Sequence, residues 1–514
     1  MSLSRRNVLA LGAALSALGF APARAVGDMP RLPTFGPAEP FSREGLRAHV
    51  ERLAQRRYVA PPKVPKGWRE LSYDQYQKIW FDGRNALWTE SDRPARVDFF
   101  PAGLYFPSPI TIHVVEGGQA RPIEFDFEAF DKTDKFPDLP TDGMGFSGFR
   151  LRSELERPGI FTEYAVFQGA SYFRAIGAGQ SYGLSARGLA LKTGDAEGEE
   201  FPEFRAFWLE APEAGAQTVT LHALLDSPSV AGIYSFKITP GDDTLMDVTA
   251  EIFPRVPLEH VGLAAETSMF LFDETNRVQF DDFRSGVHDS DGLSIYNGAG
   301  EWLWRPLANP ARLERSFFVD ENPRGVGLMQ RTRRAEDYGD LQAHYHKRPG
   351  LWVTPGEAWG EGSVMLVEIP ADKEIYDNIV AYWRPRAPLE PGKGHRFSYR
   401  LTWGADPAGP AMLARVTNTR MGERVFEDGR IAAIDFAPHP SLPEDLSEVT
   451  TFVSANRGRV SKGILHRNPA TGGVRLDFTY DPGEARAMEM RAQLRLAGRN
   501  ISEVWMYRWT RAEG

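Results

Sequence analysis

The sequence predicts an all-β protein in which a large β-sandwich precedes a smaller one. Many short segments alternate apolar with polar residues, and Gly or Pro residues separate them, which is typical of antiparallel strands joined by turns. The chain has 12 Trp, 16 Tyr and 32 Phe, and we expect most of these rings in the core and some along a sugar-binding cleft. A Pro- and Gly-rich segment from Arg384 to Gly394 divides this pattern into two parts.

Two short helices are expected before the strands begin. Ser42 is a candidate N-cap, and Leu46, Val50 and Leu53 recur on one face of a helix that follows it. A helical turn or two is expected from Ser72 through Ile79.

The remaining segments predict strands in chain order. In the large sandwich the clearest alternation lies at 110–114, 123–127, 219–221 and 233–238, with a turn at 240–243. After the linker, strands are expected at 395–403, 432–436, 473–480 and 488–496, and short strands over about 120 residues fit an immunoglobulin-like sandwich. The predicted organisation is a signal segment (1–25), a large sandwich that carries the functional site (26–384), a linker (385–394) and a smaller sandwich (395–514).

The first 25 residues predict export from the cytoplasm. Arg5 and Arg6 precede an apolar run from Val8 to Ala21, and Ala23-Arg-Ala25 has the small-x-small pattern of a signal-peptidase site. The adjacent arginines, followed by Val8 and Leu9, are typical of a twin-arginine signal, so the twin-arginine translocase is an expected partner. We therefore expect a mature chain that begins near Val26 and works in the periplasm.

Composition excludes several classes of function. Removal of the signal takes away three arginines and no acid, which changes the net charge from −9 to −12, so nucleic-acid binding is not expected. The chain has no Cys, which excludes disulfides, thiolate metal sites and cysteine nucleophiles. No motif indicates a phosphate loop, a calcium loop or a serine nucleophile elbow, and a zinc site is not expected from His344 and His346 alone. We therefore expect no metal and no cofactor.

Acidic residues among aromatic ones are the best candidates for chemistry. Asp289 and Asp291 lie in a short polar turn, Trp302, Trp304 and Arg305 follow it, and Asp377 precedes a run typical of a strand. Glycosidic cleavage needs one carboxyl group as an acid and another as a base, and apolar neighbours raise the pKa of the acid. Asp is also a common turn residue, so these residues alone leave a structural role open.

The same segments resemble the periplasmic glucan biosynthesis protein G and D family over nearly the whole mature chain. The most specific strings are Ser171-Tyr-Phe-Arg-Ala-Ile-Gly177, Tyr182-Gly-Leu-Ser-Ala-Arg-Gly-Leu-Ala190, Gly198-Glu-Glu-Phe-Pro202, Val287-His-Asp-Ser-Asp-Gly-Leu293, Gly300-Glu-Trp-Leu-Trp-Arg-Pro306 and Asp377-Asn-Ile-Val-Ala-Tyr-Trp383. The resemblance implies a galactose-mutarotase-like sandwich joined to an immunoglobulin-like domain. It also implies processing of osmoregulated periplasmic glucans, which have a β-1,2-linked glucose backbone. Within the family, the arginine pair favours the D-type over the G-type.

The resemblance also implies roles for individual residues. It makes the protein similar to endo-acting β-1,2-glucanases that invert the anomeric centre, with Asp377 as general acid and Asp289 as candidate base. Tyr345 would lie near the scissile linkage, and Asp291 would serve as the base or orient it. In an inverting enzyme the two carboxyls stand about 6.5–9.5 Å apart, and a larger gap would need a chain of waters. Trp302, Trp304 and Arg305 are weaker candidates for lining the glucan groove.

Three questions stay open at this point. The alternative function is a non-catalytic glucan-binding protein that assists synthesis or export of the glucan backbone. The sequence does not separate hydrolysis from transglycosylation. It also leaves the oligomeric state open, a homodimer included.

Overall fold

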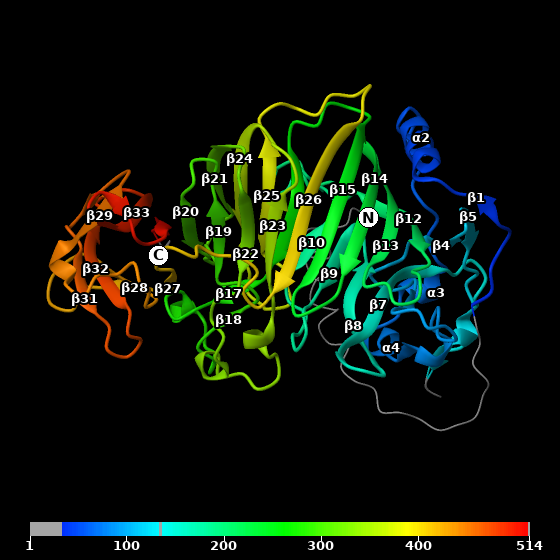
Figure 1. Cartoon of the computed structure of the whole chain (residues 1–514), viewed down its shortest axis with the longest axis horizontal. Coiled ribbons are helices and arrows are strands. Elements are labelled where there is room, and N and C mark those ends of the chain that lie inside the picture. Colours follow the sequence, from blue (N-terminus) through cyan, green and yellow to red (C-terminus); the bar gives the residue numbers. More distant parts are fainter. Residues whose placement is uncertain (1–32, 133–135, 512–514) are drawn as a thin grey trace.

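The computed structural model describes residues 33–132 and 136–511. Its regular secondary structure is mostly strand, which confirms the all-β prediction, while the galactose-mutarotase-like and immunoglobulin-like types stay predictions. Two large sheets face each other through the middle of an elongated molecule, and a smaller sheet forms the C-terminal end (Figure 1). The predicted signal segment lies outside the described residues.

The larger sheet has sixteen strands and runs nearly the whole length of the molecule. Its hydrogen-bonded order is β1 (Glu39–Pro40), β5 (Gln119–Pro122), β4 (Thr111–Glu116), β12 (Glu203–Glu210), β13 (Val219–Ser227), β14 (Val230–Thr239), β15 (Thr244–Pro254), β26 (His395–Gly404), β23 (Gly350–Pro355), β22 (Gly325–Met329), β19 (Gly292–Tyr296), β20 (Trp302–Pro306), β35 (Val504–Thr510), β33 (Ala487–Leu496) and β29 (Val449–Ala455), with β34 (Arg499–Asn500) on β33.

The second sheet has ten strands and includes β25, which follows Asp377. Its order is β21 (Glu314–Glu321), β24 (Glu361–Glu368), β25 (Ile379–Pro385), β16 (Val261–Ser268), β10 (Ser185–Arg187), β9 (Tyr172–Ala175), β8 (Ile160–Gln168), β7 (Phe146–Arg157) and β3 (Arg96–Pro101), with β11 (Ala190–Leu191) on β16. We call the face of this sheet that points away from the larger sheet its outer face.

The smaller sheet and the short elements complete the chain. The five-stranded sheet has β27 (Val416–Glu423), β28 (Arg430–Phe436), β32 (Val474–Asp481) and β30 (Arg459–Val460), with β31 (Ile464–Arg467) on β32. Two-stranded pairs join β17 (Phe270–Phe272) to β18 (Val287–His288) and β2 (Ile79–Phe81) to β6 (Phe130–Lys132). The helices are α2 (Arg43–Ala54), α3 (Lys66–Arg69) and α4 (Tyr73–Tyr76), and the 3₁₀ turns are η1 (Gly83–Asn85), η2 (Phe127–Ala129), η3 (Arg277–Gln279), η4 (Ala335–Asp337), η5 (Tyr345–Lys347) and η6 (Leu446–Glu448).

The two predicted helices, α2 and α4, form where their caps predict. The Ser42 side chain accepts a hydrogen bond from the Gly45 N–H, and Leu46 and Val50 are buried against the larger sheet. Ser72 and Gln75 form a reciprocal capping box at α4, but this helix lasts a single turn before β2 begins at Ile79.

One predicted strand is wrong. Residues 123–127 alternate, but only Ile123 makes an isolated bridge, and η2 starts at Phe127. The Asp126 carboxylate accepts a hydrogen bond from the Glu128 N–H at 2.9 Å, so a local cap competes with strand pairing.

Aromatic rings fill the space between the two large sheets. Phe149 and Phe167 come from the ten-stranded sheet and meet Phe207 and Phe236 of the larger sheet with ring centroids 5.0–5.8 Å apart. Burial of each such side chain contributes about 1.5–3 kcal/mol, so this layer stabilises the packing of the two sheets. The expectation that most rings lie in the core agrees with this arrangement.

The strand after the Pro- and Gly-rich segment does not belong to the smaller sheet. β26 pairs with β15 on one side and β23 on the other, inside the larger sheet. The chain crosses to the five-stranded sheet only after Gly404. A two-domain division stays a prediction, and the pairing of β26 argues for a boundary after Gly404 rather than at 385–394.

The larger sheet itself continues into the C-terminal region. β20 and β35 pair in parallel, with Leu303 opposite Val504 and Trp304 opposite Trp505. β33 and β35 then pack on the five-stranded sheet around a second apolar core, where Phe478 and Trp505 have ring centroids 5.9 Å apart. One backbone hydrogen-bond network therefore joins the two ends of the molecule.

Candidate active site

Asp377 lies in the loop that leads into β25 of the ten-stranded sheet. Asn378, the next residue, fixes this loop: its side-chain oxygen accepts from the Phe270 N–H at 2.8 Å, and its amide donates to the Phe270 carbonyl at 2.9 Å. It also donates to the Ile369 carbonyl at 3.0 Å. The Asp377 carboxyl is buried, with 4% of the residue exposed. The loop is thus held at three points, and Asp377 has a fixed position.

Two buried arginines surround Asp377. Arg174 of β9 lies 3.6 Å from its carboxylate, and Arg187 of β10 is near enough to act on it electrostatically. Arg187 is held by Thr267 Oγ1 at 2.7 Å and by Glu199 at 2.5 Å. Since all of these side chains are buried, their charges interact in a medium of low polarity.

The surroundings of Asp377 favour its neutral form. Burial, and to a lesser extent the charge of Asp289, raise the pKa of its carboxyl to about 6 against the lowering effect of Arg174. A carboxyl with this pKa can hold a proton in weakly acidic solution and still release it. Asp377 therefore has the property that a general acid needs.

Asp289 lies in the turn between β18 and β19, also buried. Its carboxylate accepts a short hydrogen bond from the Arg348 guanidinium, and its N–H donates to the Met269 carbonyl at 2.8 Å. The preceding His288 packs between Phe270 and Tyr338, and burial lowers the pKa of its imidazole, which favours the neutral ring. Asp289 is thus paired with one guanidinium, and it lies near enough to Asp377 to raise the pKa of that carboxyl.

Tyr345 begins the short turn η5, which also positions Arg348. His344 has a left-handed backbone (φ 48°) that redirects the chain just before Tyr345. The Tyr345 hydroxyl donates to Glu374 at 2.8 Å, and the Arg348 guanidinium lies over its ring at 4.3 Å. Burial raises the pKa of the Tyr345 phenol, which keeps it protonated as a donor. Tyr345 thus lies beside the pair formed by Arg348 and Asp289.

Asp291 points to a different set of partners. One of its carboxylate oxygens accepts from the Arg331 and Thr332 N–H groups at 2.9 Å each and from the Thr332 hydroxyl at 3.1 Å. These residues follow β22, so Asp291 ties the β18–β19 turn to the segment after β22. Asp289 and Asp291 lie in a turn, and their side chains do not share one set of contacts.

Residues 330–332 connect the site with the C-terminal region. Gln330 donates to the backbone carbonyls of His288 and Tyr345, at 2.9 and 3.3 Å. The Arg331 side chain donates to both oxygens of Glu503 at 2.7 Å each and lies 3.6 Å from the Trp304 ring centre. We call this contact between Arg331, Glu503 and Trp304 the Arg331 clamp.

Trp302, Trp304 and Arg305 make their contacts elsewhere. Trp302 stacks with Tyr296 and with Trp352, with ring centroids 4.6 and 5.3 Å apart. The Trp304 indole fills the space that a Gly292 side chain would take, and Arg305 is buried in an ion pair with Glu368 at 3.1 Å. None of these contacts joins them to Asp377 or Asp289, so their role in a groove stays a prediction.

The arginines around the site are the residues that sequence reasoning missed. Arg174, Arg187 and Arg348 are buried, although charged side chains mostly face solvent. A signal was present, because Arg174, Arg187 and Glu199 all lie in the strings that carry the family resemblance. Only the structure shows that Arg174 and Arg187 meet at Asp377 and that Arg348 pairs with Asp289.

Within residues 33–132 and 136–511 we find no helix that is both long and apolar enough to cross a membrane. The same described residues hold no group of three His, Cys, Asp or Glu side chains arranged to bind a metal ion.

Fold and site together define a class: an all-β protein with two buried carboxyl groups, Asp377 and Asp289, each beside buried arginines. Comparison with known sequences then gives the family, because residues 41–509 match the model of the family described as "Periplasmic glucan biosynthesis protein, MdoG". The chain belongs to this family, whose description places it in the periplasm.

Named relatives agree with this assignment. The chain is 46% identical over 489 residues to "Glucans biosynthesis protein G" of Vibrio cholerae, covering 94% of this chain and 89% of that protein. It is 46% identical over 466 residues to the protein of the same name in Shewanella baltica, covering 90% and 86%. The corresponding protein of Shewanella sp. strain ANA-3 is 44% identical over 475 residues, covering 91% and 87%.

Proposed function

We propose that this protein cleaves the backbone of periplasmic β-1,2-glucan within the chain, with inversion at the anomeric carbon. The observation that carries the proposal is the pair of buried carboxyl groups, Asp377 and Asp289, with the pKa of Asp377 raised to about 6. Two carboxyls in unlike surroundings are what acid and base roles in glycoside cleavage require. Cleavage of this kind would control the length of the glucan backbone.

In this proposal each residue has one task. Asp377 gives its proton to the leaving glycosidic oxygen, while Asp289 accepts a proton from the attacking water, directly or through other waters. Arg348 holds the Asp289 carboxylate, and the Tyr345 hydroxyl lies next to that pair to orient sugar or water. If a sugar hydroxyl attacks in place of water, the same groups catalyse transglycosylation.

Asp291 is the less favoured candidate for the base. One of its oxygens already accepts three hydrogen bonds from Arg331 and Thr332, which supports an orienting role for the turn that carries Asp289. Its other oxygen is buried and makes no hydrogen bond in the described part of the chain.

A non-catalytic role in binding the glucan and assisting backbone synthesis is the second candidate. The observation that favours it is the name shared by the family and the relatives, which speaks of biosynthesis. Both roles need glucan as a partner, so binding alone does not separate them.

The test is incubation of linear β-1,2-glucan with the wild-type protein and with Asp377→Asn. We expect shorter chains from the wild type and none from the variant, because an amide cannot donate the proton. New reducing ends with the α-anomer, followed by NMR during the reaction, would support inversion. If the wild type leaves the chain length unchanged from pH 4 to 8, the binding role is the better description.

We also propose export through the twin-arginine translocase and, on the arginine pair alone, the D-type subfamily. The named relatives are called protein G, so the subtype rests only on Arg5 and Arg6. Replacing both with Lys should keep the full-length protein in the cytoplasm, as measured by cell fractionation. Unchanged export would contradict the twin-arginine route.

A further inference from the structure

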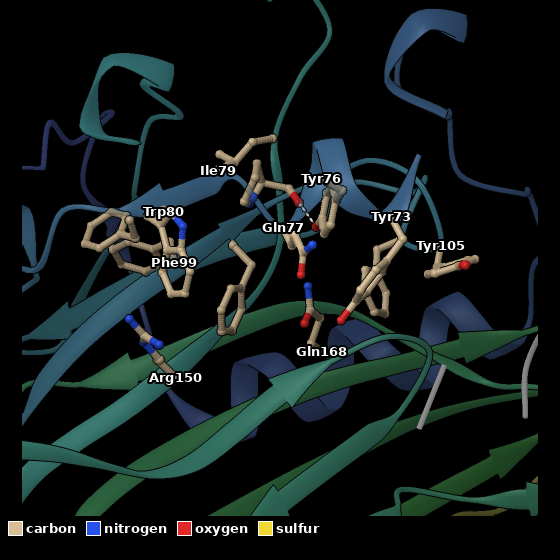
Figure 2. A pocket seen from close by; sticks show the side chains of 13 residues that line it. Tyr73, Tyr76, Gln77, Ile79, Trp80, Phe99, Tyr105, Arg150 and Gln168 are labelled. Atoms are coloured by element: carbon tan, nitrogen blue, oxygen red, sulfur yellow. Dashed lines mark hydrogen bonds between the residues drawn. The ribbon is translucent and has the colours of Figure 1, made fainter. Parts of the chain in front are cut away.

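An aromatic pocket opens beside the ten-stranded sheet, apart from the Asp377 loop. It lies between the segment of α4 and β2, the residues from β3 to Phe106, and two residues of the sheet, Arg150 of β7 and Gln168 of β8 (Figure 2). Eight of its thirteen lining residues are Phe, Tyr or Trp. None of these thirteen belongs to the candidate site described above.

The polar groups of this pocket are few and are placed together. Figure 2 shows the amides of Gln77 and Gln168 pointing toward each other, with Tyr73 beside them. Gln168 is held in place because its amide donates to Ser147 Oγ at 2.9 Å. A mostly apolar pocket with a few fixed amides is a common design for small neutral ligands, since an amide can donate to one hydroxyl and accept from another.

The charge in the pocket is already balanced. Arg150 is the one charged residue among the thirteen, and it pairs with Asp98 at 2.8 Å and Glu163 at 2.9 Å. A guanidinium held by two carboxylates has little attraction left for a phosphate or another anion. The pocket therefore fits a neutral ligand that has flat apolar faces and hydroxyl edges.

The strand register links this pocket to the site. Arg150 is opposite Val166, and Val166 is opposite Arg174, so one cross-strand row runs from the pocket to the arginine that contacts Asp377. Arg150 and Arg174 lie two strands apart, about 10 Å at ordinary strand spacing. Both belong to the outer face of the sheet, because Phe149 and Phe167 point into the core from the adjacent positions.

We infer that this pocket, defined by Trp80, Phe100, Tyr105, Gln77, Gln168 and Arg150, binds a neutral glucosyl unit of the same glucan chain that reaches Asp377. The inference rests on the proposed substrate and deepens it, since it assigns a second sugar-binding position away from the cleaved bond. Rings supply the stacking faces, and the two glutamines supply hydrogen bonds. The pocket would then favour long chains over short ones.

The test measures binding in an Asp377→Asn background, in which no chain is cut. Trp80→Ala should weaken binding of long linear β-1,2-glucan about tenfold by calorimetry, as expected when one aromatic anchor is removed, and leave the β-1,2-linked disaccharide unaffected. The matched control is Trp208→Ala, another half-buried indole, which stacks on His113 of the larger sheet at 4.9 Å. Hydrogen exchange of residues 73–81 should also slow when long glucan is added.

Two results would overturn the inference. One is equal affinity of the Trp80→Ala and Trp208→Ala proteins for long glucan. The other is a long glucan that does not bind, or that binds without protecting residues 73–81. The cleavage assay with the wild-type protein tests the proposed function separately. If binding depends on Trp80 but the wild type does not shorten the chain, the pocket is supported and hydrolysis is contradicted. Tighter binding of a neutral aromatic compound than of glucan would reject the sugar.

Discussion

At the scale of single residues, Asp377 is a carboxyl that the fold holds away from water. Its native pKa of about 6 lies above the ordinary value of 3.8, chiefly because of burial. The folded state therefore prefers the protonated form, while the unfolded state loses its proton at lower pH. The stability that this proton contributes is present below about pH 4 and is lost as pH rises through about 6.

The first prediction follows from this loss of stability with rising pH. Between pH 4 and pH 7.5 the wild type should lose about 1–3 kcal/mol of unfolding free energy relative to Asp377→Asn, which does not ionise. Denaturant unfolding of both proteins at several pH values measures it. Cleavage of glucan by the wild type should likewise decline above about pH 6, because the acid form disappears. A stability difference that is independent of pH would show that Asp377 is not perturbed.

Arg348 and Asp289 give the second prediction. Arg348→Ala alone leaves a buried carboxylate without its partner and should cost about 3–5 kcal/mol of unfolding free energy. Adding Asp289→Asn should recover part of this loss, because the uncompensated charge is gone. A double-mutant cycle by denaturant unfolding gives the coupling. Simple additivity of the two substitutions would mean that the pair has no special interaction.

The sequence predicted some residues of the candidate site and missed others. Asp377 and Asp289 were candidates because they are acidic residues among aromatic ones, and the family resemblance added Tyr345. The structure places Tyr345 and Asp289 at one guanidinium. Their partner Arg348 was missed, since its role depends on a left-handed turn at His344 that no local pattern announces. Contacts between residues far apart in sequence depend on strand order, which alternation alone does not supply.

At the scale of elements, the Arg331 clamp joins the turn that carries Asp289 to the C-terminal region. The backbone N–H of Arg331 donates to Asp291, and its side chain binds Glu503, which is fully buried and also accepts from the Val416 N–H. A displacement of Glu503 would therefore be passed to the turn that carries Asp289 through Arg331. The C-terminal region thus has a part in positioning the site.

The third prediction tests this clamp. Glu503→Gln should lower the unfolding free energy by about 3 kcal/mol, because Arg331 loses its buried counter-charge. We also expect slower glucan cleavage with little change in glucan affinity, since the Asp289 turn loses its anchor. Arg459→Gln is the control, because its ion pair with Asp481, also in the C-terminal region, is exposed. Unchanged cleavage rates in a stable Glu503→Gln protein would remove the positioning role.

The positions of individual strands along the chain were predicted better than the pairing of those strands in the sheets. The segments 219–221, 233–238 and 432–436 all lie within strands, because alternation reports which residues face a core. The strand at 395–403 was also predicted, but its place between β15 and β23 was not. The order of strands in a sheet is set by pairing between residues far apart in the sequence. The Pro- and Gly-rich segment was therefore interpreted locally, as the end of a domain.

At the scale of the whole molecule, the parallel pairing of β20 with β35 makes one sheet of the two parts. β35 also pairs with β33 and covers the second core through Trp505. Without β35, the edge of β20 and the apolar faces of the C-terminal strands would be open to water. Open strand edges of this kind favour aggregation.

The fourth prediction concerns a chain that stops at Gly498. We expect it to be largely insoluble, with the remainder showing increased dye binding to exposed apolar surface, whereas a chain ending at Arg511 should behave like the wild type. Solubility after expression and size-exclusion chromatography measure this. A soluble, monodisperse chain without β35 would show that the rest of the sheet is stable by itself.

The position of β35 in the order of synthesis has a consequence for when folding can finish. A ribosome delivers β20 about two hundred residues before its parallel neighbour, at any ordinary rate of elongation. During that interval β20 has no parallel neighbour on this side, because β35 is either not yet synthesised or still inside the exit tunnel. The sheet can therefore be completed only after translation ends. A quality-control step that requires a folded protein would then accept only chains in which β35 has already paired with β20.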